Sequence, residues 1–199
     1  SNIPEFMKWK RQLRREIYQR HVDASEAYLD HDVIVWPETA IPTFYSVAEQ
    51  EFVSQYAQQL SQHKAEIIAG AFTYKPSTEE IYNSVVSISD PPRFYSKRHL
   101  VPFGEYLPLR DLFYLFDRFV KIPVSNLSPG QGIPLMIIGN RPVGISICYE
   151  AVFADEILAA VPYAQWLINI TNDAWFGSSL APHQHLQIAR VRAAETGRY

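Results

Sequence analysis

Three residues that could carry out covalent chemistry lie either directly after an apolar stretch that is expected to form a strand or in a polar turn. Glu38 follows the apolar residues 33–36. Lys97 lies in a polar turn, and Cys148 comes directly after the apolar residues 143–147. Because strand ends in α/β proteins converge on a crevice where ligands bind, we expect the acid, the amine and the thiol to meet there.

These three side-chain types together would make a nucleophilic site. A free thiol has a pKa of about 8.5, so only a small fraction is thiolate at neutral pH. A nearby ammonium lowers that pKa, and a carboxylate can take the proton during attack. Lys97 and backbone N–H groups after Cys148 could then hold the oxyanion that forms on a carbonyl. A single cysteine at a strand end is more often a small buried apolar residue, so the hypothesis depends on all three residues meeting.

The elements that must position these residues alternate between helices and strands. Apolar periodicity predicts helices at 8–20, 49–63, 151–160 and 182–197. Continuous apolar runs predict strands at 32–36, 66–74, 81–89, 133–138, 142–147 and 165–170, and the first of these reads as buried on both faces. The pattern indicates the α/β class, and a hairpin around Gly139 and Asn140 favours mixed sheets.

Composition bounds the possible functions. The 199 residues fit one domain, and the net charge of −3 offers no basic field for nucleic acid. No run approaches the roughly 18 apolar residues of a membrane span, and the single cysteine cannot form an intrachain disulfide. We expect no metal at His183 and His185, because residues two apart on a helix point in different directions.

An apolar stretch at 109–120 does not fit a compact α/β core, because it lies in a connection of some 25 residues. One interpretation is an ordinary packed helix. The other is a lid that covers the site, in which Phe113 and Phe116 contact substrate and keep water away from a reactive intermediate.

Glu38, Lys97 and Cys148, in this order and with this spacing, resemble the Glu-Lys-Cys triad of the nitrilase superfamily. The flanking residues are more specific and resemble the apolipoprotein N-acyltransferase family. Four stretches carry that resemblance: residues 35–42 (VWPETAIP), 97–108 (KRHLVPFGEYLP), 144–150 (GISICYE) and 172–177 (NDAWFG). Soluble nitrilase relatives share the three catalytic residue types, but they usually lack the long lysine segment and often have Asp at the position of Glu150.

The resemblance implies an αββα sandwich, with two mixed β-sheets flanked by helices. It also implies an enzyme of the bacterial inner membrane whose catalytic domain faces the periplasm. That enzyme moves a fatty acyl chain from a phospholipid to the free α-amino group of the diacylglyceryl-cysteine that begins an apolipoprotein. The reaction passes through a cysteine thioester and needs no cofactor.

The resemblance also implies roles for individual residues. Cys148 matches the nucleophile, Glu38 the base and Lys97 the oxyanion stabiliser. The remaining matches are a second acidic residue, two residues that flank the nucleophile and a tryptophan near the substrate entrance: Glu105, Tyr149, Glu150 and Trp9.

The chain departs from the family in lacking the membrane helices and the further strands of the superfamily fold. We therefore expect residues 1–199 to be an excised or incomplete catalytic domain whose membrane contacts lie in other segments. A soluble amidase of the same superfamily, using the same triad, is the main alternative, although the stretches 100–108 and 109–120 argue against it. A catalytically silent binding domain is the second alternative.

Overall fold

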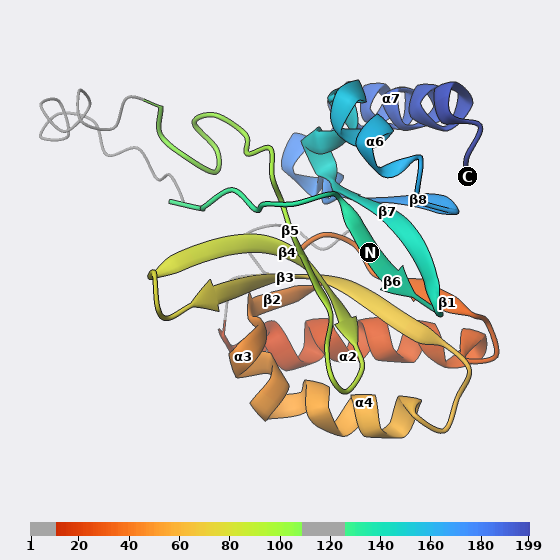
Figure 1. The fold of residues 1–199 in the computed structure, drawn as a ribbon. Helices are drawn as coiled ribbons and strands as arrows, with labels where there is room; N and C mark the ends of the chain where they lie inside the picture. The colour runs from red at the N-terminus through yellow and green to blue at the C-terminus, as the bar shows by residue number, and fades with distance from the viewer. Residues whose placement is uncertain (1–10, 109–125) are drawn as a thin grey trace, which may run out of the picture.

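The computed structural model describes residues 11–108 and 126–199 of the chain (Figure 1). Within these residues, eight strands form two sheets. The strands are β1 (Val33–Val35), β2 (Ile41–Phe44), β3 (Glu66–Lys75), β4 (Glu80–Ile88), β5 (Phe94–Ser96), β6 (Leu135–Ile138), β7 (Arg141–Ile147) and β8 (Trp166–Ile170). The α-helices are α2 (Arg14–Ser25), α3 (Tyr45–Ala48), α4 (Ser54–Leu60), α6 (Ala154–Ala160) and α7 (Ala181–Thr196).

The elements stack in four layers (Figure 1). Helices α2, α3 and α4 lie on the outer face of the first sheet, which contains β1 to β5. The second sheet contains β6, β7 and β8 and is covered on its far side by α6 and α7. This arrangement is the expected αββα sandwich.

Both sheets are mixed, as expected. In the first sheet, β1 and β2 run parallel to β3, whereas β4 runs antiparallel to both β3 and β5. In the second, β6 and β7 form the expected antiparallel hairpin and β8 runs parallel to β7. The carboxyl ends of β1, β7 and β8 are followed by the loops that carry the candidate site residues.

Alternate residues of the central strands fill two separate apolar layers, because successive side chains of a strand point to opposite faces. Ile67 of β3 joins the cluster beneath the helices, together with Trp36 and Tyr56. The next residue, Ile68, joins the cluster between the two sheets, where it packs with Ile145 of β7 and its neighbours. The inner cluster holds the two sheets together and fixes their strand ends relative to one another.

The sequence expectations differ from the structure in several elements. The strand expected at 32–36 is shorter and is not buried on both faces, because β1 lies at an edge of its sheet and Val35 is 44% exposed. The helix expected at 49–63 is a continuous helical segment that begins at Tyr45 and contains a π-helical turn, Glu49–Val53. The short strands β2 and β5 were not predicted.

Candidate active site

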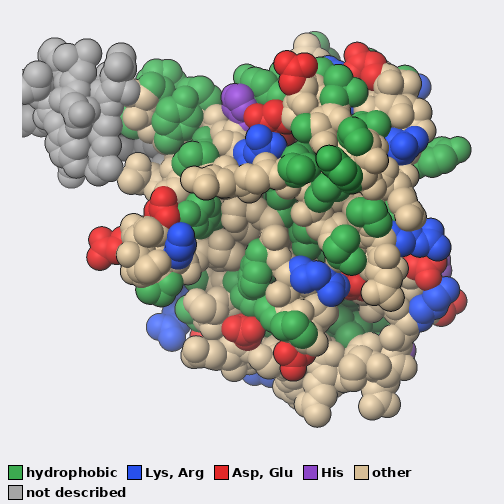
Figure 2. All heavy atoms as spheres, in the orientation of Figure 1, with side chains coloured by type: hydrophobic (Ala, Val, Ile, Leu, Met, Phe, Trp, Pro, Cys, Tyr) green, Lys and Arg blue, Asp and Glu red, His purple; other side chains and the backbone are tan. Residues whose placement is uncertain are grey.

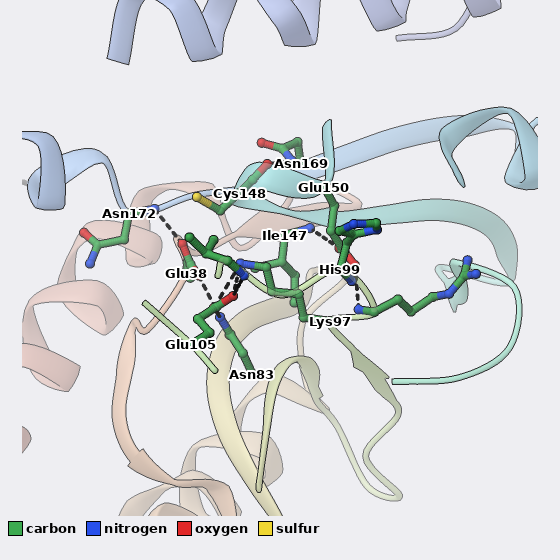
Figure 3. Close-up of polar contacts among 12 residues, drawn as sticks. Glu38, Asn83, Lys97, His99, Glu105, Ile147, Cys148, Glu150, Asn169 and Asn172 are labelled. Carbon is green, nitrogen blue, oxygen red and sulfur yellow. Dashed lines mark hydrogen bonds and ion pairs between the residues drawn. The ribbon is translucent and has the colours of Figure 1, made fainter. Parts of the chain in front are cut away.

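Cys148 is the residue at which strand β7 turns into a 3-10 turn, Cys148–Val152. Its backbone φ is +50°, in the left-handed region that residues other than glycine rarely adopt. Such a conformation costs on the order of 1–3 kcal/mol and persists only where neighbouring groups hold it in place. The sharp turn presents the partly buried thiol at the end of the strand (Figure 3).

Glu38 lies in the loop that connects β1 to β2, and both of its carboxylate oxygens are held. Oε1 accepts a hydrogen bond of 2.7 Å from Nδ2 of Asn83, and Oε2 accepts one of 3.0 Å from the backbone N–H of Asn172. The side chain is only 6% exposed. The carboxylate therefore has a fixed position at the base of the site.

Gly70 of β3 lets the Glu38 loop pack directly on the sheet. Its N–H donates to the carbonyl of Pro37 at 3.1 Å. A Cβ at position 70 would lie 2.6 Å from Cα of Glu38 and 2.6 Å from the backbone nitrogen of Thr39. These are backbone atoms, so only a shift of the whole loop could relieve the contact.

We expect Gly70→Ala to lower the free energy of unfolding by about 1–3 kcal/mol, the usual cost of overpacking a filled interior. Denaturant titration measures the loss. Gly104→Ala is the matched control, because a Cβ there would meet the Val101 side chain at 3.4 Å, an ordinary contact. Equal stabilities for the two variants would contradict the close approach at Gly70.

Lys97 follows β5 directly and is 1% exposed. Its ammonium contacts both carboxylate oxygens of Glu105, at 3.0 and 2.9 Å. Glu105 is held in turn by the backbone N–H of Val101, which donates to Oε2 at 2.8 Å. A buried ammonium paired in this way keeps its charge and its direction.

Asn83 of β4 connects the two acidic residues of the site (Figure 3). Its Nδ2 donates to Glu38 at 2.7 Å and to Glu105 at 3.1 Å, and the residue is 2% exposed. Among the described residues, nothing hydrogen-bonds to its Oδ1. Sequence reasoning missed this residue. The only signal for it was a single amide side chain inside the apolar run 81–86.

Glu150 ties the lysine segment to the turn that carries the cysteine. Its carboxylate is 1% exposed and accepts hydrogen bonds from the hydroxyl of Tyr95 and from three backbone N–H groups. Two of these N–H groups belong to Arg98 and His99, at 2.6 and 3.1 Å, and the third belongs to Ile147, at 2.7 Å. Burial raises the pKa of Glu150, although these hydrogen bonds oppose the rise.

Tyr149 lines an open pocket of about 470 Å³ with Phe153 and Leu127. It is 38% exposed, and its ring packs edge-on against Phe153 with 5.2 Å between the ring centroids. The residues predicted to contact substrate or to lie near its entrance are Trp9, Phe113 and Phe116, and all three lie outside the described residues.

The structure thus brings Glu38, Lys97, Glu105 and Cys148 together (Figure 3). The thiol interacts electrostatically with both the Glu38 carboxylate and the Lys97 ammonium. Burial, and then the charge of Glu38, raise the pKa of Cys148 to about 11, so the resting side chain is a neutral thiol. Burial also raises the pKa of Glu38. Burial alone would lower the pKa of Lys97, but the carboxylates of Glu38 and Glu105 outweigh that effect and raise it.

These charge states define the chemistry open to the site. A neutral thiol beside a carboxylate favours attack assisted by a general base over attack by a preformed thiolate. The Lys97 ammonium can stabilise negative charge that develops on an oxygen bonded to the attacked carbon.

Among residues 11–108 and 126–199 there is no group of three His, Cys, Asp or Glu side chains placed to hold a metal ion. In the same part of the chain, no helix has the length and apolar character to cross a bilayer.

Figure 2 shows the surface of one face of the molecule, on which apolar, acidic and basic side chains are interspersed. The acidic and basic groups of this face do not gather into a patch of one sign (Figure 2). The mixture of acidic and basic side chains on this face is consistent with the small net charge of −3, and the face has no extended basic surface.

Comparison with known proteins gives concordant results. A model of the carbon–nitrogen hydrolase family matches residues 7–199. The chain is 40% identical to the apolipoprotein N-acyltransferases of Methylococcus capsulatus and Nitrosomonas europaea, and 33% identical to that of Coxiella burnetii. Each alignment covers all of this chain but only 40–41% of the relative. The chain therefore spans about two fifths of the length of these curated relatives.

Solved structures show the same fold at low sequence identity. The nitrilase-superfamily protein Nit3 of Saccharomyces cerevisiae superposes with a TM-score of 0.64 at 17% identity, over 96% of this chain and 68% of that one. A carbon–nitrogen hydrolase from Helicobacter pylori gives a TM-score of 0.65 at 16% identity, over 94% of this chain and 65% of that one.

Proposed function

The chain belongs to the carbon–nitrogen hydrolase family, and from that membership we propose that it is the catalytic part of an N-acyltransferase that acts on apolipoproteins. Its similarity to several relatives of that name, along its whole length, supports the proposal. The observation that carries the mechanism is the placement of the Cys148 thiol beside the buried side chains of Glu38 and Lys97.

In the first half-reaction, Glu38 takes the thiol proton while the sulfur of Cys148 attacks the ester carbonyl of a phospholipid. A C–S bond forms, and the carbonyl electrons move to the oxygen. Lys97 and the N–H of Tyr149 stabilise that oxyanion. The intermediate then collapses, the ester C–O bond breaks, and the lysophospholipid leaves with the proton held by Glu38. A thioester on Cys148 remains.

In the second half-reaction, the α-amino group of a diacylglyceryl-cysteine attacks the thioester carbon. Glu38 accepts a proton from the amine as the C–N bond forms. The C–S bond then breaks, and Glu38 gives this proton to the departing sulfur, which restores the thiol. The two steps share one covalent intermediate and give ping-pong kinetics. Because conversion of a thioester to an amide is downhill, no cofactor or nucleotide is required.

On this proposal the partners are a phospholipid as acyl donor and a diacylglyceryl-modified apolipoprotein as acceptor. Both are lipids or lipid-anchored, so the reaction takes place at a membrane, which we propose to be the bacterial inner membrane with the domain on its periplasmic side. Glu105 maintains the charge and direction of Lys97, and Glu150 maintains the position of the lysine segment beside the nucleophile.

The second candidate is a carbon–nitrogen hydrolase that uses the same three residues on an amide or nitrile, with water accepting the acyl group. The match of residues 7–199 to the carbon–nitrogen hydrolase family favours it. The two candidates differ in what resolves the thioester. Efficient release of ammonia from short amides, without acyl transfer from phospholipid, would support the hydrolase.

Mass spectrometry of the intact protein after exposure to phospholipid vesicles tests the proposal. We expect the mass of one acyl chain on the peptide that contains Cys148, and its removal when a diacylglyceryl-cysteine peptide is added. Cys148→Ala should show neither change. Acylation that is unaffected by Cys148→Ala, or no acylation of the wild-type protein, would contradict the mechanism.

A further inference from the structure

The carbonyl oxygen of Cys148 is held by two side chains that are not part of the triad. Nε2 of His185, on helix α7, lies 2.9 Å from this oxygen, and Nδ2 of Asn169 lies 3.3 Å from it. A carbonyl oxygen can only accept a hydrogen bond, so Nε2 of His185 carries a hydrogen and donates it. These two donors hold the carbonyl of a residue that is in the left-handed conformation, which neighbouring groups must maintain.

The other side of the imidazole ring is also fixed. Nδ1 of His185 lies 3.1 Å from Oδ1 of Asp173 and 3.3 Å from the hydroxyl of Thr171. Thr171 in turn donates to Asp173 at 3.0 Å. The histidine side chain is 11% exposed. These contacts set the orientation of the ring, and with it the direction in which Nε2 points.

The direction of the Cys148 carbonyl determines the direction of the following N–H group. In a trans peptide the C=O and N–H bonds point to opposite sides. With the carbonyl turned toward His185, the N–H of Tyr149 faces the sulfur of Cys148 and hydrogen-bonds to it. A donor on the carbonyl also polarises the peptide group and strengthens its N–H as a donor.

From this geometry we propose that His185 is a positioning residue that holds the Cys148–Tyr149 peptide so that the N–H of Tyr149 faces the developing oxyanion. The inference rests on the proposed function, because an oxyanion forms there only when the sulfur attacks a carbonyl. The oxyanion is bonded to the same carbon as the sulfur, so an N–H that already faces the sulfur needs no rearrangement to reach it. The second donor is Lys97, which approaches from the other sheet.

Two reactions of the same thiol separate this role from a general structural one. Acylation by a short-chain thioester passes through an oxyanion, whereas alkylation by iodoacetamide occurs at a tetrahedral carbon and does not. In the intact protein, we expect His185→Ala to slow single-turnover acylation of Cys148 by about 10- to 100-fold. Alkylation of Cys148 should fall by no more than about threefold, because it loses only the weak contact between the Tyr149 N–H and the sulfur, while Glu38 remains in place as the base. Mass spectrometry of the Cys148 peptide measures both rates.

Two further variants complete the experiment. His185→Gln retains an N–H donor close to the position of Nε2 and should recover most of the acylation rate. His183→Ala removes an exposed histidine from the same helix and should leave both rates unchanged. An equal loss in acylation and alkylation, or no loss in either, would overturn the inference. If the thioester acylates the wild-type protein but phospholipid does not, the proposed function fails while the ratio of rates in the variants still decides the role of His185.

Discussion

Replacement of Glu38 by glutamine is expected to slow acylation of Cys148 by about 10²- to 10⁴-fold at neutral pH, the range for loss of a general base. The reason is the resting state of the nucleophile. In the wild-type protein the pKa of the thiol is raised to about 11, mainly by burial and further by the charge of Glu38. The burial persists in the variant and favours the neutral thiol, so little thiolate is present without a base to accept the proton. Glutamine has nearly the same size as glutamate, but it cannot accept that proton.

The pH dependence of the two proteins should differ in slope. In the wild-type protein, acylation rises with pH as Glu38 loses its proton and then levels off. Burial raises the pKa of Glu38, so this rise occurs above the ordinary carboxyl value of 4.5. In Glu38→Gln only the thiolate reacts, and acylation should rise about tenfold for each pH unit through neutrality. Single-turnover acylation, measured between about pH 5 and pH 9 on both sides of neutrality, gives both profiles.

Glu80→Gln is the control for this experiment, because Glu80 lies at the β3–β4 hairpin and its carboxylate accepts hydrogen bonds from the nearby Thr78 and Tyr82 hydroxyls. Its profile should coincide with that of the wild-type protein. Parallel profiles for Glu38→Gln and wild type would show that Glu38 does not accept the thiol proton.

The long central strands could be predicted from sequence, whereas the short ones could not. Strands β3 and β4 contain apolar runs with turn residues between them, and the expected bounds agree with the structure to within one residue at each end. Strands β2 and β5 have four and three residues, which is too short for an alternating pattern to be recognised. The burial of β1 was predicted wrongly because the apolar character of a strand does not reveal whether it lies at an edge.

The placement of residues after strand ends located three side chains that the structure brings together, Glu38, Lys97 and Cys148. The groups that hold them could not be found in this way. Gly70 matters because a loop from elsewhere in the chain packs on it, and Asn83 matters because two carboxylates approach it from different segments. Neither relation leaves a local pattern in the sequence, since each depends on how distant segments meet in space.

The other large effect is expected from Lys97→Met, which removes a buried charge and leaves its partners in place. We expect acylation to fall by about 10²- to 10³-fold through loss of an oxyanion donor. We also expect the free energy of unfolding to fall by about 3–5 kcal/mol, because Glu105 and Glu38 lose the ammonium that offsets their burial. Single-turnover acylation and denaturant titration measure the two losses.

The loss of stability should increase with pH, and a second substitution should relieve it without restoring activity. Without Lys97 the pKa of Glu38 rises further above 4.5, so the folded variant binds a proton more tightly than the unfolded chain does. The stability of the variant is therefore greatest at low pH and falls as pH rises through the pKa that Glu38 has in the folded variant.

Adding Glu105→Gln removes one uncompensated carboxylate and should recover part of the stability, while acylation stays low because the oxyanion donor is still missing. Recovery of acylation in the double variant would contradict a direct role for Lys97 and would indicate that its main task is to neutralise Glu105.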